Sequence, residues 1–190
     1  MEPLTAEGTG SGAIRVVPYN PDWPFLFARI KHELVCHLGG LLDSVHHVGS
    51  TSVPGLAAKP KIDVDAVIAD TARLEEAVAL MRLKSEWAFQ GEPYGDGVWT
   101  FTSGHGSWGA RLYLCAPGTA THEKRILFRD WLRTHCEDAA KYEALKRRLA
   151  AEADGDWNAY TGGKSSFVTA IVERARLEVQ ADRQREKIDG

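Results

Sequence analysis

The sequence predicts an α+β fold, in which a mixed β-sheet has helices packed on it and a helical part follows at the C-terminus. Three observations support this fold class. Strand and helix patterns mix without strict alternation before residue 116, Gly-rich turns separate the later strands, and the last third of the chain has helical periodicity. No linker or internal repeat divides the chain, so we expect one domain over residues 14–180.

The two ends of the chain are expected to lie outside this domain. Residues 1–13 are small, polar and Gly-rich, which predicts a disordered leader. The segment 181–190 is charged and is expected to fray. Between them, the C-terminal helices are expected to begin near residue 122.

The first predicted element is a short edge strand at Ile14–Val17, which is followed by a turn with several prolines. Apolar residues then recur at three- and four-residue steps from Phe25 to Leu42. This periodicity predicts a helix, which Gly39 and Gly40 weaken near its end.

Two strands are expected on either side of a turn rich in glycine and serine. Ser44–Val48 is typical of a short strand, and Ile62–Ile68 is a β-branched run with partial alternation. The segment Gly49–Gly55 between them has neither helical nor strand periodicity. Thr71 is then expected to cap a helix whose apolar face ends at Met81.

The remaining elements are three strands and three helices. The strands are expected at Trp87–Gln90, Val98–Thr102 and Ala110–Cys115. The helices are expected at Glu123–Arg133, Asp138–Ala153 and Gly163–Gln180, where they would form a small bundle docked beside the sheet.

The charge balance narrows the classes of partner. In a chain of 190 residues, Lys and Arg total 23 against 26 Asp and Glu, which gives a net charge of −3. This balance argues against general nucleic-acid binding and against an acidic membrane surface, while it still allows a local basic cleft. We therefore expect a small-molecule substrate, and the sequence predicts no particular oligomeric state.

The cysteines and the apolar runs indicate where in the cell the protein is expected to lie. Cys36, Cys115 and Cys136 are far apart and no CxxC occurs, so neither a disulfide framework nor a cysteine zinc site is predicted. Residues 1–13 have no apolar core of a signal peptide, and the longest apolar runs are shorter than the ~20 residues of a membrane span. We therefore expect a cytoplasmic protein without a membrane segment.

Two aspartates in one predicted strand are the main candidates for catalysis. Asp63 and Asp65 are two residues apart, so their side chains share one face of the strand, about 6.8 Å apart. Asp is depleted in strands, which favours a functional role, although an exposed strand face is the alternative. Two carboxylates aimed at one space suit Mg²⁺, which takes oxygen ligands.

The turn before this strand can hold phosphate. Gly49 lets backbone N–H groups approach a ligand closely, and Ser50 and Thr51 add hydroxyl groups. Lys59 adds positive charge between the turn and the strand. A metal beside a phosphate cradle is what phosphoryl or nucleotidyl transfer requires, whereas a purely structural turn is the alternative.

Further basic residues are candidates for anion binding. Arg125, Arg129 and Arg133 recur every four residues and share a helix face, which favours an anion-binding stripe or, alternatively, a solvated face with Arg129 paired to the neighbouring acid. Lys164 lies near a predicted helix start and is a candidate for contacting an anion there. Lys146 is interpreted as surface charge, although its spacing from a tyrosine four residues earlier also allows it to point into the cleft.

The stretch from His47 to Asp65 resembles the signature of the GrpB family, a branch of the nucleotidyltransferase superfamily. The matching residues are His47, Gly49, Ser50, Thr51, Val53, Pro54, Gly55, Leu56, Ala58, Lys59, Pro60, Ile62 and Asp63. Further matches are Tyr19, Pro21, Trp23, Pro24, the block Phe128–Arg133, and Tyr142, Leu145, Lys146, Tyr160 and Lys164. The resemblance extends from about Arg15 to Ala175.

The resemblance implies a nucleotidyltransferase-like sheet and an activity. The protein would transfer a nucleotidyl or phosphoryl group from a Mg²⁺-bound NTP, such as ATP, to a small acceptor. Gly49 and Ser50 would bind the triphosphate, Asp63 and Asp65 would hold the metal, and Arg129 would balance charge.

The chain departs from the superfamily pattern at the third carboxylate. The strand expected at Ala110–Cys115 contains neither a carboxylate nor a histidine, and Glu92, which matches a family Gly-Glu pair, is the best spare carboxylate. Two alternatives therefore stay open. One is a non-catalytic nucleotide or metabolite binder on the same fold, and the other is an enzyme that acts on a small acid or amine through Arg111 and Tyr113.

Overall fold

The computed structural model describes residues 14–105 and 108–189, and the expected leader lies outside them. Its centre is a mixed five-stranded sheet in the order β1-β2-β5-β4-β3. The strands are β1 (Leu42–Val48), β2 (Lys61–Ile68), β3 (Ala88–Gly91), β4 (Trp99–His105) and β5 (Trp108–Cys115). β2 and β5 pair in parallel and the other neighbours are antiparallel, so the α+β fold class is confirmed.

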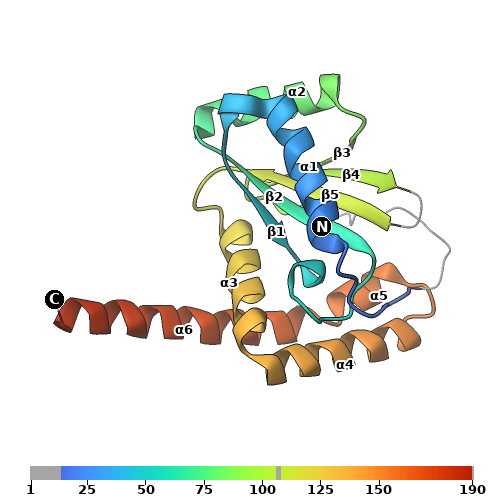
Figure 1. The fold of residues 1–190 in the computed structure, drawn as a ribbon, viewed down its shortest axis with the longest axis vertical. Helices are drawn as coiled ribbons and strands as arrows, with labels where there is room; N and C mark the ends of the chain where they lie inside the picture. The colour runs from blue at the N-terminus through green and yellow to red at the C-terminus, as the bar shows by residue number, and fades with distance from the viewer. Residues whose placement is uncertain (1–13, 106–107, 190) are drawn as a thin grey trace.

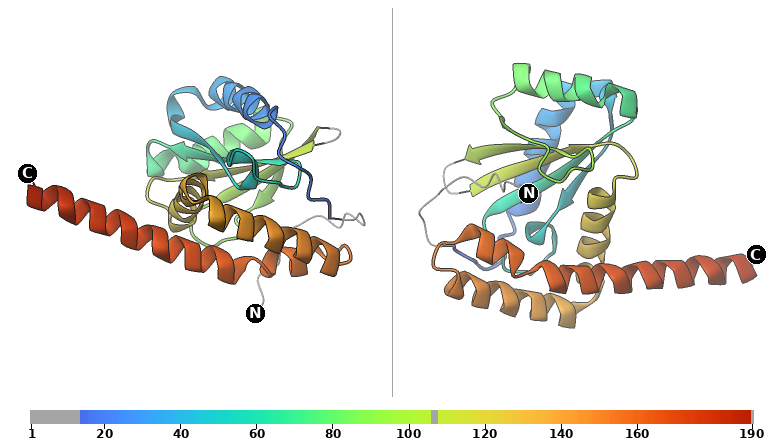
Figure 2. Two further views of the ribbon diagram at one scale, coloured as in Figure 1. Left: turned by 60° about the horizontal axis from the view of Figure 1, so that its bottom comes forward. Right: turned by 180° about the vertical axis from the view of Figure 1, so that it is seen from behind.

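One face of the sheet is covered by two helices, α1 (Trp23–Leu38) and α2 (Leu74–Lys84) (Figures 1 and 2). The alternate residues of β2, among them Ile62, Val64 and Ala66, are fully buried in the core that these helices share with the sheet. Because successive strand residues point to opposite faces, Asp63 and Asp65 lie on the other face. Their paired neighbours on β5 are Arg111 and Tyr113, respectively.

The opposite side of the sheet carries the C-terminal helices (Figure 2). They are α3 (Ala120–Thr134), α4 (Cys136–Glu152), α5 (Trp157–Gly162) and α6 (Ser165–Asp189). A second apolar cluster joins the connection between β1 and β2 to α3 and α4, through Val53, Leu56, Leu132 and Tyr142. The C-terminal end of α6 extends away from the rest of the fold (Figures 1 and 2).

The N-terminal elements differ from the sequence predictions in three details. The edge strand expected at Ile14–Val17 is reduced to one antiparallel bridge between Val17 and Ala58. The first helix ends at Leu38 because Gly39 has a φ of +47°, which the chain uses to leave the helix. The cap assigned to Thr71 is instead provided by Asp70, whose carboxylate accepts from the Ala72 N–H.

The C-terminal elements differ in two further details. The short helix α5 was not predicted, and it is capped by Asp156, whose side chain accepts from the N–H groups of Asn158 and Ala159. The last helix runs to Asp189, so it includes most of the segment that was expected to fray. No helix among the described residues combines the length and the apolar character that crossing a membrane requires.

Candidate functional site

A cavity of about 260 Å³ lies against the sheet face that carries Asp63. It is lined by the turn after β1, by β2 and β5, and by residues from α3, α4 and the region from α5 to the start of α6. Nine of the predicted site residues line it: Gly49, Ser50, Thr51, Lys59, Asp63, Arg111, Tyr113, Arg125 and Lys164. The fold therefore brings these nine residues together, and their role in binding stays a prediction.

The glycine turn lies directly against Asp63. Val48 pairs with Asp63 in the sheet, and Gly49 follows with a φ of +70°. A Cβ on Gly49 would lie 2.5 Å from Asp63 Oδ2, which is closer than real Cβ contacts allow. Glycine is therefore required at this position by both the backbone conformation and the space.

Hydrogen bonds within the turn hold it in place. The Thr51 hydroxyl donates to the Lys61 carbonyl oxygen at 3.2 Å, so its oxygen accepts from His47 Nε2 at 3.0 Å. The Ser52 hydroxyl donates to the Gly49 carbonyl at 2.6 Å. The hydroxyl groups of Thr51 and Ser52 thus stabilise the turn. The Ser50 hydroxyl takes no part in these three hydrogen bonds.

His47 is a buried histidine that packs between the first helix and the glycine turn. Its ring stacks on Phe27 with the centroids 4.9 Å apart, on the side of the fold that α1 covers. Burial, followed by the charges of Arg133 and Arg129, lowers the pKa of His47 from 6.5 to about 4. The imidazole therefore stays neutral at physiological pH, in the tautomer that carries its proton on Nε2 and donates it to Thr51.

The depressed pKa of His47 predicts a pH-dependent stability. Between pH 6.5 and about 4 the unfolded chain binds more protons at this residue than the folded chain, so stability falls as the pH falls. At about pH 5 the loss from this group is about 2 kcal/mol. Urea unfolding of the wild type and of His47→Gln at neutral pH and near pH 5 checks this. The wild type should lose more stability than the variant, and equal losses would contradict the buried neutral state.

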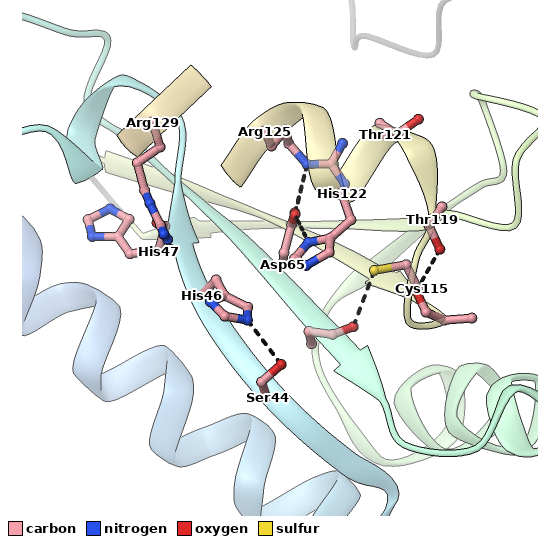
Figure 3. A network of polar contacts seen from close by, with 12 residues as sticks. Ser44, His46, His47, Asp65, Cys115, Thr119, Thr121, His122, Arg125 and Arg129 are labelled. Carbon is pink, nitrogen blue, oxygen red and sulfur yellow. Dashed lines mark hydrogen bonds and ion pairs between the residues drawn. The ribbon is translucent and has the colours of Figure 1, made fainter. Parts of the chain in front are cut away.

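Asp65 does not face the cavity as a free carboxylate. It is fully buried, and Figure 3 shows it between two residues of α3. Arg125 Nε donates to its two oxygens at 2.8 and 3.0 Å, and His122 Nδ1 donates to Oδ2 at 2.7 Å. Asp63 is therefore the one carboxylate among the described residues that line the cavity. The expectation that both aspartates present their oxygens to one metal does not match this arrangement.

Two other predicted site residues lie outside the cavity lining. Arg129 donates to the His47 carbonyl at 3.1 Å and pairs with Asp130 at 2.7 Å, so it fastens α3 to the end of β1 (Figure 3). Glu92 is exposed and accepts from the Gly97 N–H within the turn between β3 and β4. Neither side chain is placed to bind a ligand in the cavity.

Of the two positions left open for Lys146, the structure shows the one that points into the cavity. This residue is 2% exposed, lines the cavity, and donates to the Ala57 carbonyl. Its ammonium lies 4.8 Å from the centre of the Tyr142 ring, and burial lowers its pKa to about 7. The spacing of Tyr142 and Lys146 on one helix face was the signal in the sequence that pointed to this position.

Aromatic rings hold several of the cationic side chains. Lys59 lies 4.2 Å from the Trp157 ring centre and 4.7 Å from that of Tyr160. Lys164 lies 4.2 Å from the Tyr160 ring, and Arg125 lies 4.0 Å from the Tyr113 ring. These cation–π contacts place the three cationic side chains against aromatic rings around the cavity.

Comparisons with known proteins place the chain among related sequences. A protein-family model described as GrpB protein matches residues 13–174. A UPF0157 protein of Halalkalibacterium halodurans is 34% identical over 177 residues, with 87% of this chain and 84% of that protein covered. A dephospho-CoA kinase of Mycolicibacterium paratuberculosis is 30% identical, and the match covers 90% of this chain but 48% of that protein.

Solved structures show the same fold. The conserved protein GrpB from Enterococcus faecalis superposes with a TM-score of 0.79 at 27% identity, covering 87% of this chain and 99% of that one. A chain of the GLD-2/RNP-8 complex matches with a TM-score of 0.53 at 9% identity. The match covers 73% of this chain and 58% of that one, and it shows a shared fold alone.

Proposed function

This chain belongs to the GrpB family, and we propose that it binds the phosphate groups of a nucleotide in the cavity beside Asp63. The charge of the cavity lining carries this proposal. Six basic residues line it, namely Lys59, Lys61, Arg111, Arg125, Lys146 and Lys164, against one acidic residue among the described lining residues. Arg125 is paired with Asp65 behind the lining, and burial lowers the pKa of Lys146 to about 7, so the other four residues contribute most of the positive charge. In a chain with a net charge of −3, such a concentration of cations selects a polyanionic ligand.

The size of the cavity and the aromatic rings that line it favour an organic phosphate as the ligand. A volume of about 260 Å³ is near the small end of small-molecule sites, which accommodates the phosphate end of a nucleotide more readily than a large ligand. Tyr94, Tyr113 and Tyr160 also line the cavity, so apolar and aromatic surface lies next to the cations. The relative named dephospho-CoA kinase makes dephospho-CoA a suitable member of a ligand panel.

Nucleotidyl or phosphoryl transfer is the second candidate. It is favoured by the nucleotidyltransferase-like sheet and by the position of Asp63 against the Gly49 turn, where a phosphate would lie next to a carboxylate. The donor set does not fit the two-carboxylate Mg²⁺ site of that chemistry, because Asp65 is buried and bound by Arg125 and His122. We therefore assign no step to a metal, and transfer is tested separately from binding.

Calorimetric titration with ATP, ADP, dephospho-CoA and inorganic phosphate tests the binding proposal. We expect at least one nucleotide to bind more tightly than inorganic phosphate, and Lys164→Gln to weaken it about tenfold because one charged hydrogen bond is lost. The matched control is Lys84→Gln, which removes an exposed charge at the end of α2. If no nucleotide binds with or without Mg²⁺, the proposed function is wrong.

Turnover separates the two candidates. Incubation with ATP and Mg²⁺ followed by chromatography of the nucleotides would show ADP, AMP or diphosphate if the protein transfers a group. Asp63→Asn should then abolish product formation, since Asp63 is the carboxylate that lines the cavity. Binding without any product supports the non-catalytic role.

A further inference from the structure

The pairing of Asp65 has a consequence for how an anion is held in the cavity. Both oxygens of this buried carboxylate accept hydrogen bonds from α3, at 2.7 to 3.0 Å (Figure 3). Metal binding at Asp65 would require these N–H donors to leave and the Arg125 guanidinium to lose its partner. The charge of the carboxylate is thus already balanced by a cation that belongs to the chain.

The guanidinium of Arg125 is fixed from two sides. Its Nε is held by Asp65, and its Cζ atom lies 4.0 Å from the centre of the Tyr113 ring. Burial alone would lower the pKa of Arg125, but the nearby Asp65 and Tyr113 outweigh burial and raise the pKa above its usual value. The guanidinium therefore stays charged and keeps one orientation next to the cavity.

The side of the guanidinium away from Asp65 is the part that can reach a ligand. Arg125 lines the cavity, and its Nη2, which shares with Nε the edge that faces Asp65, is buried without a further hydrogen-bond partner in the described structure. This edge is therefore used to hold the carboxylate. A guanidinium that uses one edge for Asp65 can offer its other edge to a phosphate or carboxylate oxygen.

We propose that Arg125, held by Asp65, takes the place of a divalent cation in this cavity, so that the phosphate ligand binds without Mg²⁺. Asp65 then acts as a positioning residue that fixes a protein-borne cation rather than as a metal ligand. This proposal rests on the proposed function, because it names a residue through which the same cavity would hold its anion. It assigns Arg125 to ligand binding and leaves Asp63 as the carboxylate next to the ligand.

The first test is a titration of the wild type with ATP in EDTA and in excess MgCl₂. We expect ATP to bind in EDTA with an affinity of the same order as in MgCl₂. Binding in MgCl₂ alone would overturn this proposal and leave the proposed function intact. Absence of binding in both conditions would instead overturn the proposed function itself, so the two failures are distinguishable.

The second test removes the fixed cation. Arg125→Gln alone leaves Asp65 buried without its partner, so the double variant Asp65→Asn/Arg125→Gln removes both charges together and preserves the fold better. We expect it to bind ATP in EDTA about tenfold to a hundredfold more weakly than the wild type. Arg125→Lys keeps the charge but loses the planar guanidinium that can donate from two edges, so its affinity for ATP in EDTA should lie between those of the wild type and the double variant.

The control for this test is Lys124→Gln. It removes a positive charge from the adjacent residue of α3, as Arg125→Gln does, and Lys124 does not line the cavity. Its affinity for ATP should equal that of the wild type. A folded double variant that binds ATP in EDTA as tightly as the wild type would overturn the assignment of Arg125.

Discussion

Replacing Asp65 with asparagine is expected to lower the free energy of unfolding by about 3 kcal/mol. The carboxylate is fully buried, and it is the acidic partner of Arg125 at 2.8 Å and of His122 at 2.7 Å. The neutral amide would leave the Arg125 guanidinium buried without its compensating charge, which costs far more than an exposed ion pair contributes. Urea unfolding at neutral pH measures the change.

An exposed ion pair on the same helix is the matched control. Asp130→Asn breaks the contact with Arg129, but the Asp130 side chain is 51% exposed, so we expect a loss of about 0.5 kcal/mol. The double variant Asp65→Asn/Arg125→Gln should recover part of the stability that Asp65→Asn loses, since both buried charges are then absent. An Asp65→Asn variant as stable as the wild type would contradict the buried pair.

Gly49→Ala is expected to lower the free energy of unfolding by about 3 kcal/mol, through two additive causes. The residue has φ +70° and ψ −174°, a backbone conformation that residues other than glycine rarely adopt. The new Cβ would also lie 2.5 Å from Asp63 Oδ2, so Asp63 would have to move. Since Asp63 lines the cavity, ATP affinity should change together with stability.

Gly55→Ala separates these two causes. Gly55 has a φ of +79°, but a Cβ there would meet no atom within 4 Å. This variant suffers the backbone strain alone, so it should lose about 1 kcal/mol and keep the affinity of the wild type for ATP. Thermal unfolding and calorimetry of both variants check this. Equal effects at the two glycines would contradict the close contact between Gly49 and Asp63.

The pattern of the sequence was sufficient to predict the strands of the sheet and the part of the site that the Gly49 turn and Asp63 form. β-Branched runs and glycine turns located five strands, and the period of two placed Asp63 on the face opposite Ile62 and Val64. The Gly49 turn could be joined to Asp63 because consecutive strands usually pair, and β1 and β2 do so in antiparallel orientation. The elements themselves are defined by residues near one another in the chain, which is why periodicity and turn chemistry predicted them.

The C-terminal half of the site depends on how the helices dock. The period of α3 showed that Arg125 and Arg129 share a helix face, but not what that face meets. In the structure Arg125 reaches Asp65 and Arg129 reaches the His47 carbonyl, across more than fifty residues of chain. Lys146 was likewise assigned to the surface, because helical spacing does not tell which of two polar faces is buried.

The sequence alone thus determined the order of the elements, the glycine turn and the shared face of the two aspartates, all of which depend on neighbours within a few residues. The tertiary structure decided that Asp63 lines the cavity while Asp65 is bound by α3. The physical reason is that a buried carboxylate requires a cation, and the nearest one is brought by a helix that packs across the sheet long after the strand in the chain.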